Sequence, residues 1–185
     1  IGGGTTDIAV VRNGVLEGTK MFALGGRRMT KRIEQQQNCS YYEAERIKLS
    51  LDEKPLERSE LTKLKQMLLQ DAKVWRSGVV LTLEEFNQDT PLPGNIYLCG
   101  GGSLLPQISL VLEEESWFKE LHFLDKPSIM KVRCSDIEAF TDDTGELSDP
   151  QDVTVLALAH LALDLAGEEK LIDRLLRKTL KIMRN

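Results

Sequence analysis

Residues 1–11 read Ile-Gly-Gly-Gly-Thr-Thr-Asp-Ile-Ala-Val-Val, and this stretch decides the fold. Three successive glycines without a Cβ allow the backbone to turn tightly and to approach a ligand closely. Successive backbone N–H groups in such a turn form a concavity that binds anions, and two threonine hydroxyls add further donors. The β-branched run over 8–11 predicts a strand. The stretch therefore predicts a phosphate-binding turn at the start of a strand.

The strand is expected to continue into a hairpin. Asn13-Gly14 is the dipeptide typical of a two-residue hairpin turn, and a second strand is expected over residues 15–24. An ordinary glycine-rich hairpin has the same local pattern, since short glycine motifs often occur by chance. The first stretch alone leaves both interpretations open.

A second glycine stretch favours nucleotide binding. Residues 95–108 read Asn-Ile-Tyr-Leu-Cys-Gly-Gly-Gly-Ser-Leu-Leu-Pro-Gln-Ile. The apolar run 96–99 predicts a strand covered on both faces. Ser103 is a suitable N-cap and Pro106 suits the first turn of a following helix. A strand, a glycine turn and a helix N-terminus in this order place backbone donors beside a nucleotide.

In this order, the two stretches resemble the actin-like ATPase superfamily. Residues 2–7 look like its second phosphate motif, and residues 98–106 look like its adenosine motif. Residues 44–48, Ala-Glu-Arg-Ile-Lys, resemble a helix of the bacterial FtsA family. Gly25-Gly26 and the segment 152–154 also fit, so the resemblance covers about residues 1–165.

The resemblance implies an α/β fold: an RNase-H-like lobe with a mixed sheet flanked by helices. The lobe would be the second of the superfamily, with residues 1–51 and 88–167 as subdomain IIA. Residues 52–87 would form a small helical insertion in place of subdomain IIB, and residues 168–185 a C-terminal helix. The aspartate that begins the phosphate motif and the first phosphate motif are both missing. The chain is therefore interpreted as a fragment, the C-terminal half of an actin-like protein.

The resemblance also implies ATP or ADP as ligand, with Mg²⁺ held mainly by the missing half. The β- and γ-phosphates would be held by Gly2, Gly3, Gly4, Thr5 and Thr6, and the adenosine by Gly100, Gly101, Gly102 and Ser103. Glu45 would accept hydrogen bonds from the ribose, and Lys48 would lie near the base or phosphates. Asp7 would help to position water or magnesium through solvent. The alternative for Glu45 and Lys48, three residues apart on one helical face, is a simple surface ion pair.

Several helices are expected between and after the motifs. One opens at Gly25-Gly26 and runs to Gln37, with Met29 and Ile33 on its buried side and a solvated basic face of Arg27, Arg28, Lys31 and Arg32. A second follows Ser40, an N-cap with Glu43 three residues on, and runs to about Leu51.

The later part of the chain predicts three further helical regions. A long one over 57–86 contains Trp75 in its core face and Gly78, a residue that can divide it in two. Asp152 is expected to cap a helix over 153–165 that is almost entirely apolar and so buried on most sides. The helix over 168–183 is basic and amphipathic, which suits a membrane surface, a partner or packing on the domain.

Composition excludes several classes of function. The net charge is −5 and aromatic residues make up 5%, which argues against nucleic-acid binding. Three widely spaced cysteines and two isolated histidines predict neither a disulfide framework nor a metal site. No apolar run is long enough to span a bilayer. The cysteine usage suits the cytoplasm, at the inner face of the membrane if the last helix binds lipid.

The resemblance implies a slow ATPase of the FtsA type that acts in bacterial cell division through filament assembly or membrane tethering. Partners would be the missing N-terminal lobe, further copies of the protein, or a cell-division or pilus protein. Since phosphoryl transfer needs groups on both sides of the cleft, this chain alone is expected to lack useful ATPase activity. The alternatives are a PilM-like scaffold of pilus assembly, a chaperone-type ATPase disfavoured by the small insertion, and an interaction module that no longer binds nucleotide.

Overall fold

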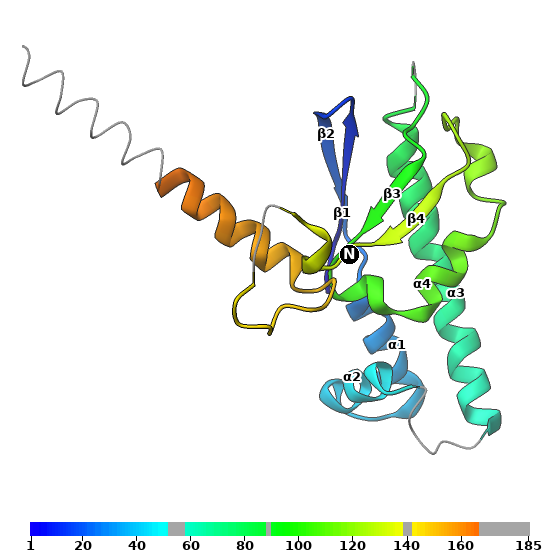
Figure 1. Ribbon diagram of the computed structural model, residues 1–185. Coiled ribbons are helices and arrows are strands. Elements are labelled where there is room, and N and C mark those ends of the chain that lie inside the picture. Colours follow the sequence, from blue (N-terminus) through cyan, green and yellow to red (C-terminus); the bar gives the residue numbers. More distant parts are fainter. Residues whose placement is uncertain (52–57, 88–89, 139–141, 167–185) are drawn as a thin grey trace, which may run out of the picture.

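The strands form one antiparallel and one parallel pair. The computed structural model describes residues 1–51, 58–87, 90–138 and 142–166 (Figure 1). β1 (Thr6–Arg12) and β2 (Val15–Phe22) form an antiparallel hairpin, and β3 (Asn95–Leu98) pairs with β4 (Ser128–Lys131) in parallel. At the hairpin turn, Asn13 and Gly14 have φ values of 50° and 78°, as the Asn-Gly pair predicts. Both pairings with flanking helices confirm the α/β class, although the described strands form two sheets of two strands instead of one mixed sheet.

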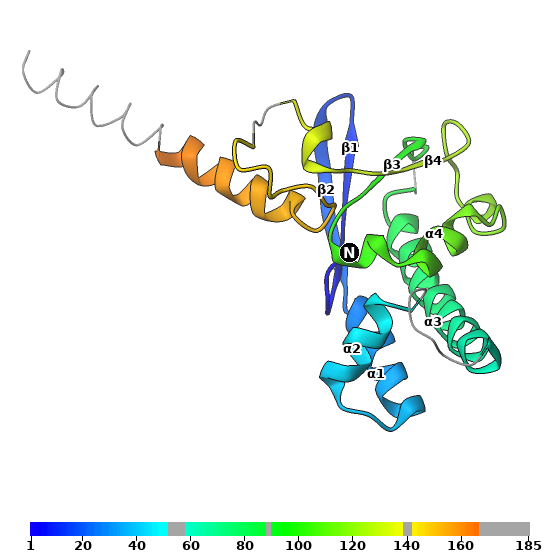
Figure 2. The ribbon, with the colours of Figure 1, turned by 60° about the horizontal axis from the view of Figure 1, so that its bottom comes forward.

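Two of the predicted helices form as the sequence indicates. α1 (Gly26–Gln37) buries Met29 and Ile33, which are 3% and 0% exposed. α2 (Tyr41–Leu49) is capped by Ser40, whose hydroxyl accepts a hydrogen bond from the Glu43 N–H at 3.2 Å. In both ribbon views α1 and α2 lie together below the hairpin (Figures 1 and 2).

The long helix α3 (Arg58–Glu84) is continuous, so Gly78 does not divide it in two. A Cβ on Gly78 would lie 2.8 Å from a ring carbon of Phe22, which explains the glycine by close packing on β2. α3 and α4 (Pro106–Glu113) lie side by side in both views (Figures 1 and 2). These four helices position the glycine turns.

The start of α4 differs from the prediction. Residues Gly101–Leu104 form a short 3₁₀ helix, and Leu105 occupies the N-cap of α4 with Pro106 first in the helix. Ser103 is therefore not the N-cap. Its hydroxyl is fully buried and donates to the Gly100 carbonyl at 2.7 Å, so it stabilises the glycine turn itself. Two more 3₁₀ helices span Phe118–Glu120 and Cys134–Asp136.

The core lies between the helices and the inner ends of the strands. Trp75 is 4% exposed, which confirms its predicted place in the core. The least exposed apolar side chains are those of Ile33, Ala44, Leu64, Leu68, Ala72, Leu92, Ile108, Val111, Leu112 and Trp117. Most of these come from α1, α3 and α4, so apolar contacts among helices hold the described part of the chain together.

Two predictions of burial, one for a strand and one for a helix, were wrong for the described residues. Tyr97 of β3 is 61% exposed, so that strand is not covered on both faces. The helix over 153–166 exposes its apolar side chains, with Leu158 at 62% and Leu163 at 72%, and it points away from the strands (Figure 1). The Asp152 carboxylate turns back to accept from the Asp149 N–H at 3.0 Å. An apolar composition gives the tendency to be buried, but burial also needs a surface to pack against.

The C-terminal helix predicted over 168–183 lies outside the described residues, as do residues 52–57 of the insertion. The division into subdomains IIA and IIB therefore stays a prediction.

Two neighbouring glycines, Gly100 and Gly101, test how closely the turn after β3 packs against Ile1. Gly100 has a φ of 84°, and a Cβ there would lie 2.5 Å from the Ile1 carbonyl oxygen. A Cβ on Gly101 would meet nothing closer than 3.9 Å. We expect Gly100→Ala to lower the free energy of unfolding by about 1–3 kcal/mol, measured by urea denaturation. Gly101→Ala is the control and should change it by less than about 0.5 kcal/mol. Equal losses in the two variants would contradict this description.

Candidate functional site

The two glycine motifs lie against each other. We call residues 2–5 the first glycine loop and residues 100–103 the second glycine loop. The Ile1 nitrogen donates to the Cys99 carbonyl at 2.8 Å, and the Gly102 N–H donates back to the Ile1 carbonyl at 3.0 Å. The Gly100 N–H donates to the Pro150 carbonyl at 2.7 Å. Segments about a hundred residues apart in sequence thus meet through backbone hydrogen bonds.

A cleft of about 540 Å³ opens beside both loops. Six of the predicted site residues line it: Gly2, Gly3, Glu45, Lys48, Gly101 and Gly102. The remaining lining residues are Gly26, Leu49, Leu51, Leu104, Leu105, Pro106, Gln107 and Gln151. The structure therefore brings residues from both glycine loops and from α2 to one cleft, in a volume range typical of small-molecule sites.

The other predicted residues lie near the cleft but do not line it. The Thr5 hydroxyl donates to the Asp7 carboxylate at 3.3 Å on the surface. Thr6 is 3% exposed, and its hydroxyl donates to the Leu24 carbonyl at 2.8 Å. Gly4 lies beside the Arg27 side chain, and Ser103 is buried behind the second loop. The buried hydroxyl of Thr6 suits a role in holding the first loop better than direct contact with a phosphate.

The glycines of the site differ in what they make room for. A Cβ on Gly25 would lie 2.4 Å from the Gly2 carbonyl, and one on Gly102 would lie 2.4 Å from the Ile1 side chain. These two glycines allow chain segments to pack together. Gly101 has open space where its Cβ would be, apart from Gln151 at 3.9 Å. Gly101 therefore leaves room on the cleft side.

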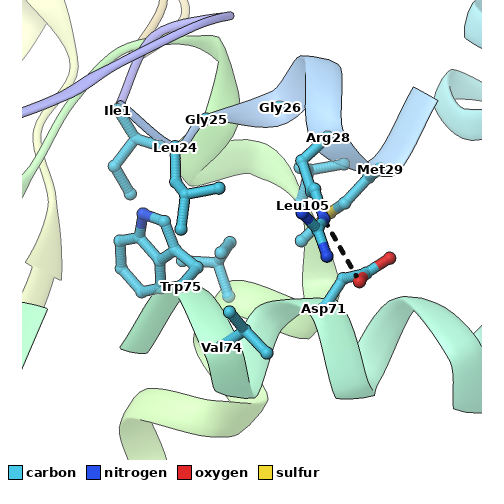
Figure 3. A pocket seen from close by; sticks show the side chains of 11 residues that line it. Ile1, Leu24, Gly25, Gly26, Arg28, Met29, Asp71, Val74, Trp75 and Leu105 are labelled. Carbon is cyan, nitrogen blue, oxygen red and sulfur yellow. Dashed lines mark ion pairs between the residues drawn. The ribbon is translucent and has the colours of Figure 1, made fainter. Parts of the chain in front are cut away.

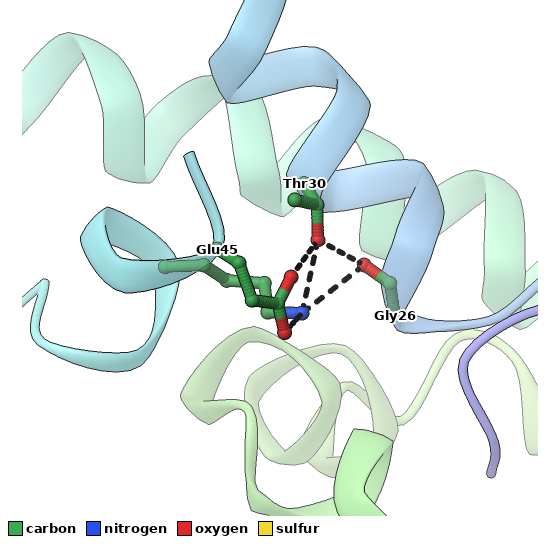
Figure 4. Close-up of polar contacts among 4 residues, drawn as sticks. Gly26, Thr30 and Glu45 are labelled. Carbon is green, nitrogen blue, oxygen red and sulfur yellow. Dashed lines mark hydrogen bonds and ion pairs between the residues drawn. The ribbon is translucent and has the colours of Figure 1, made fainter. Parts of the chain in front are cut away.

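Lys48 and Glu45 are the charged residues among the described residues that line the cleft. Figure 4 shows the polar contacts around the Glu45 carboxylate, with Thr30 and the Gly26 carbonyl. Lys48 Nζ donates to Glu45 Oε1 at 2.7 Å and to the Thr30 hydroxyl at 3.0 Å. The Thr30 hydroxyl in turn donates to Glu45 Oε2. The Lys48 side chain is 8% exposed and that of Glu45 is 35% exposed. This is more than the surface ion pair of the alternative interpretation, because the ammonium group is buried and has further acceptors.

The network sets the charge of Glu45. Partial burial alone would raise the pKa of Glu45, but hydrogen bonds from Lys48 and Thr30 and the positive charges of Lys48 and Arg27 outweigh it, so its pKa lies below the usual value. Glu45 is therefore an anion at neutral pH.

Thr30 was missed in the sequence analysis, although it is fully buried in α1. The sequence did contain a signal for it, because Thr30 lies one helical turn after Gly26 and next to Met29, on the predicted buried side of the helix. A polar β-branched residue inside a buried helical face needs a hydrogen-bond partner.

Gln107 is a second residue that the sequence analysis missed. Its side chain is 4% exposed, and within the described part of the chain its Oε1 has no hydrogen-bond partner. A buried acceptor of this kind beside a cleft costs free energy unless a ligand donor pairs with it. Leu49 and Leu104, 74% and 41% exposed, add apolar surface to the same cleft.

A small cavity of about 10 Å³ lies behind the glycine segments (Figure 3). It is lined by Leu24, Gly25, Trp75 and Asp71, among others. Asp71 is 5% exposed, and Arg28 and Arg32 lie 3.5 and 3.6 Å from its carboxylate oxygens. The basic face of α1 is solvated, as expected, since Arg28 and Arg32 remain 52% and 48% exposed while they also face this buried carboxylate of α3.

Known proteins match the chain in sequence and in fold. The family model described as cell division protein FtsA matches residues 1–157. Cell division protein FtsA of Bacillus subtilis (strain 168) is 32% identical over an alignment of 132 residues, and the match covers 62% of this chain and 30% of that protein. The chain therefore covers less than a third of the length of this curated relative.

Among solved structures, the PilM-PilN type IV pilus biogenesis complex aligns with a TM-score of 0.57. The identity is 21%, and the alignment covers 86% of this chain and 43% of that chain. At this identity the likeness is one of fold, and it confirms the predicted actin-like ATPase fold.

The network in Figure 4 predicts the titration of Glu45. We expect carboxyl NMR to give a midpoint below the ordinary pKa of a glutamate side chain. Because the folded pKa is the lower one, the stabilisation by this carboxylate is complete above the unfolded value and is lost as the pH falls through the folded pKa.

Two variants separate the contributions to this midpoint. Lys48→Met removes a hydrogen bond and a positive charge that lower the pKa of Glu45, so it should raise the midpoint. Thr30→Val removes one hydrogen bond only and should raise the midpoint less. A midpoint at or above the ordinary value in the unaltered protein would show that the network does not form in solution.

Proposed function

The chain belongs to the family of cell division protein FtsA, and from this membership and the cleft we propose that it binds ATP or ADP as part of an actin-like ATPase. One observation supports the proposal above all others. Both glycine loops and the Glu45–Lys48 pair line the same cleft of about 540 Å³. An ordinary glycine-rich hairpin would not require this convergence.

We propose that the two loops divide the nucleotide between them. Gly2, Gly3, Gly4 and Thr5 would surround the β- and γ-phosphates, with Thr6 fixing the loop from behind. The donors would be the N–H groups of Gly3 and Gly4 and the Thr5 hydroxyl, because the Gly2 N–H already donates to the Thr5 carbonyl at 2.9 Å. The second loop, Gly100 to Ser103, would lie against the adenosine, where Gly101 leaves open space. Glu45, an anion at neutral pH, would accept hydrogen bonds from the ribose hydroxyls.

The cleft suits this ligand in three respects. The Lys48 side chain is only 8% exposed, and its ammonium group would lie near the base or phosphates. Leu49 and Leu104 provide apolar surface for a base, and Gln107 Oε1 is an acceptor in need of a donor. Among the described residues that line the cleft, Glu45 is the one carboxylate, and it already pairs with Lys48. We therefore propose that most Mg²⁺ ligands come from elsewhere in the whole protein, and that Asp7 acts on magnesium or water through solvent.

For the whole protein we propose a role in bacterial cell division, as a slow ATPase that assembles into filaments or tethers the division machinery. The matched relative is itself a cell division protein. The proposed partners are an N-terminal lobe that closes the cleft, further copies of the protein and other division proteins, at the inner face of the cell membrane. Phosphoryl transfer needs both walls of the cleft, so this chain alone should turn over ATP no faster than buffer. A pilus-scaffold role remains the alternative, and no described residue favours it.

No helix in the described ranges is long and apolar enough to cross a bilayer. The segment 168–184, for which a membrane surface was one predicted partner, lies outside those ranges.

Calorimetric titration with ATP and ADP in magnesium tests nucleotide binding. We expect the unaltered chain to bind both, and Glu45→Ala to weaken binding about tenfold because a charged hydrogen-bond acceptor is lost. Gly101→Val should weaken it at least as much, because its side chain would enter the open space next to the second loop. Glu114→Ala removes an ion-paired carboxylate that is not among the cleft-lining residues, and it should bind like the unaltered chain.

Two outcomes would contradict the proposal. Binding that persists unchanged in Glu45→Ala and Gly101→Val would place the nucleotide elsewhere. No binding by the unaltered chain, even at millimolar ligand, would favour an interaction module that has lost its nucleotide.

A further inference from the structure

One buried hydrogen bond connects α3 to Thr6, the residue that follows the first glycine loop. Trp75 Nε1 on α3 donates to the Thr6 hydroxyl at 2.8 Å, and that hydroxyl donates to the Leu24 carbonyl at 2.8 Å. Trp75 and Thr6 are 4% and 3% exposed, so water does not compete for these bonds. The Thr6 hydroxyl is thereby fixed in direction, with one partner on α3 and one on the segment that leads into α1.

The segment after Leu24 is bonded to the first glycine loop in turn. The Gly26 N–H donates to the Gly2 carbonyl at 3.0 Å, and the Arg27 N–H donates to the Gly3 carbonyl at 2.8 Å. These bonds turn the loop carbonyls toward α1. The loop is therefore held at its start by the α1 N-terminus and at its end by Thr6.

The Trp75 ring has little freedom to move. It borders the cavity of about 10 Å³ in Figure 3, together with Ile1, Leu24 and Ile108. That volume is at the lower limit for a single water molecule. One turn further along α3, Gly78 packs so closely on Phe22 that a Cβ would lie 2.8 Å from its ring. The position of α3 thus determines where the indole N–H points.

We propose that Trp75 is a positioning residue through which α3 sets the first glycine loop for the phosphates of the nucleotide. This inference rests on the proposed nucleotide binding. It assigns Trp75 no contact with the ligand, since Trp75 acts through Thr6. Because coupling between two sites is reciprocal, phosphate binding at the loop also favours one position of α3.

The chain contains a matched control for this residue. Trp117, the second of its two tryptophans, is 2% exposed, and its Nε1 donates to the Leu112 carbonyl at 2.8 Å. It is not among the residues that line the cleft. Trp75→Phe and Trp117→Phe therefore each remove one buried indole hydrogen bond, but only the first bond reaches the loop.

The test compares affinities for ATP and for adenosine, which lacks phosphates. We expect Trp75→Phe to weaken ATP binding about fivefold, the equivalent of one hydrogen bond, and to leave adenosine binding unchanged. Trp117→Phe should lower thermal stability to a similar extent without changing either affinity. Thr6→Ser keeps the hydroxyl and should bind ATP more tightly than Thr6→Val does. Thr6→Val should resemble Trp75→Phe, and the double variant should be no weaker than the weaker single variant.

Fluorescence gives a second readout. In Trp117→Phe, Trp75 is the remaining tryptophan. Its emission should change on addition of ATP and stay constant with adenosine.

Different failures have different meanings. If the unaltered chain binds ATP but Trp75→Phe and Trp117→Phe bind it equally well, the positioning role is wrong and nucleotide binding stands. A parallel loss of ATP and adenosine affinity in Trp75→Phe would show a general structural role and also overturn the inference. If the unaltered chain binds no nucleotide, the proposed function fails and the inference fails with it.

Discussion

The backbone contact between Ile1 and the second glycine loop is the constraint on which the rest of the site depends. Ile1 donates to Cys99 and accepts from Gly102, so the residue before one glycine loop is bonded both to the residue before the other loop and to a residue within it. Gly100 makes this approach possible, because any Cβ there would lie 2.5 Å from the Ile1 carbonyl. Without this contact the two loops would not be held in position relative to each other, and the cleft that they form with α2 would lose its shape.

The helices place the remaining groups around that contact. α1 brings its N-terminus to the first loop and Thr30 to the Glu45–Lys48 pair, which α2 places in the cleft. α3 reaches the same loop from behind through Trp75. Charge and shape are thus supplied by different elements: α2 provides the ions, the glycines provide space, and α3 provides rigidity. Hydrogen bonds thus connect the helices of the core with the loops of the site.

The sequence predicted the parts of this structure that depend on local chemistry. The Asn-Gly turn, the Ser40 cap, the buried side of α1 and both glycine turns follow from residue types at short spacing. Contacts between distant residues could not be predicted in this way. The bond from Trp75 to Thr6, the packing of Gly78 on Phe22 and the hydroxyl of Thr30 between Glu45 and Lys48 each depend on how separate elements meet. The helix over 153–166 shows the converse, since its apolar sequence predicted burial but the described residues provide no surface that covers Leu158 or Leu163.

The most direct test of the central claim is a map of backbone amide shifts in a ¹⁵N-labelled sample of this chain on addition of ADP and magnesium. The account predicts that the largest shifts fall together on Gly2–Gly4, on Gly101–Ser103 and on the Glu45–Lys48 segment, with α4 beyond its first turn unaffected. Shifts confined to one of the two glycine loops, or concentrated on a surface away from the cleft, would contradict a single nucleotide site built from both loops.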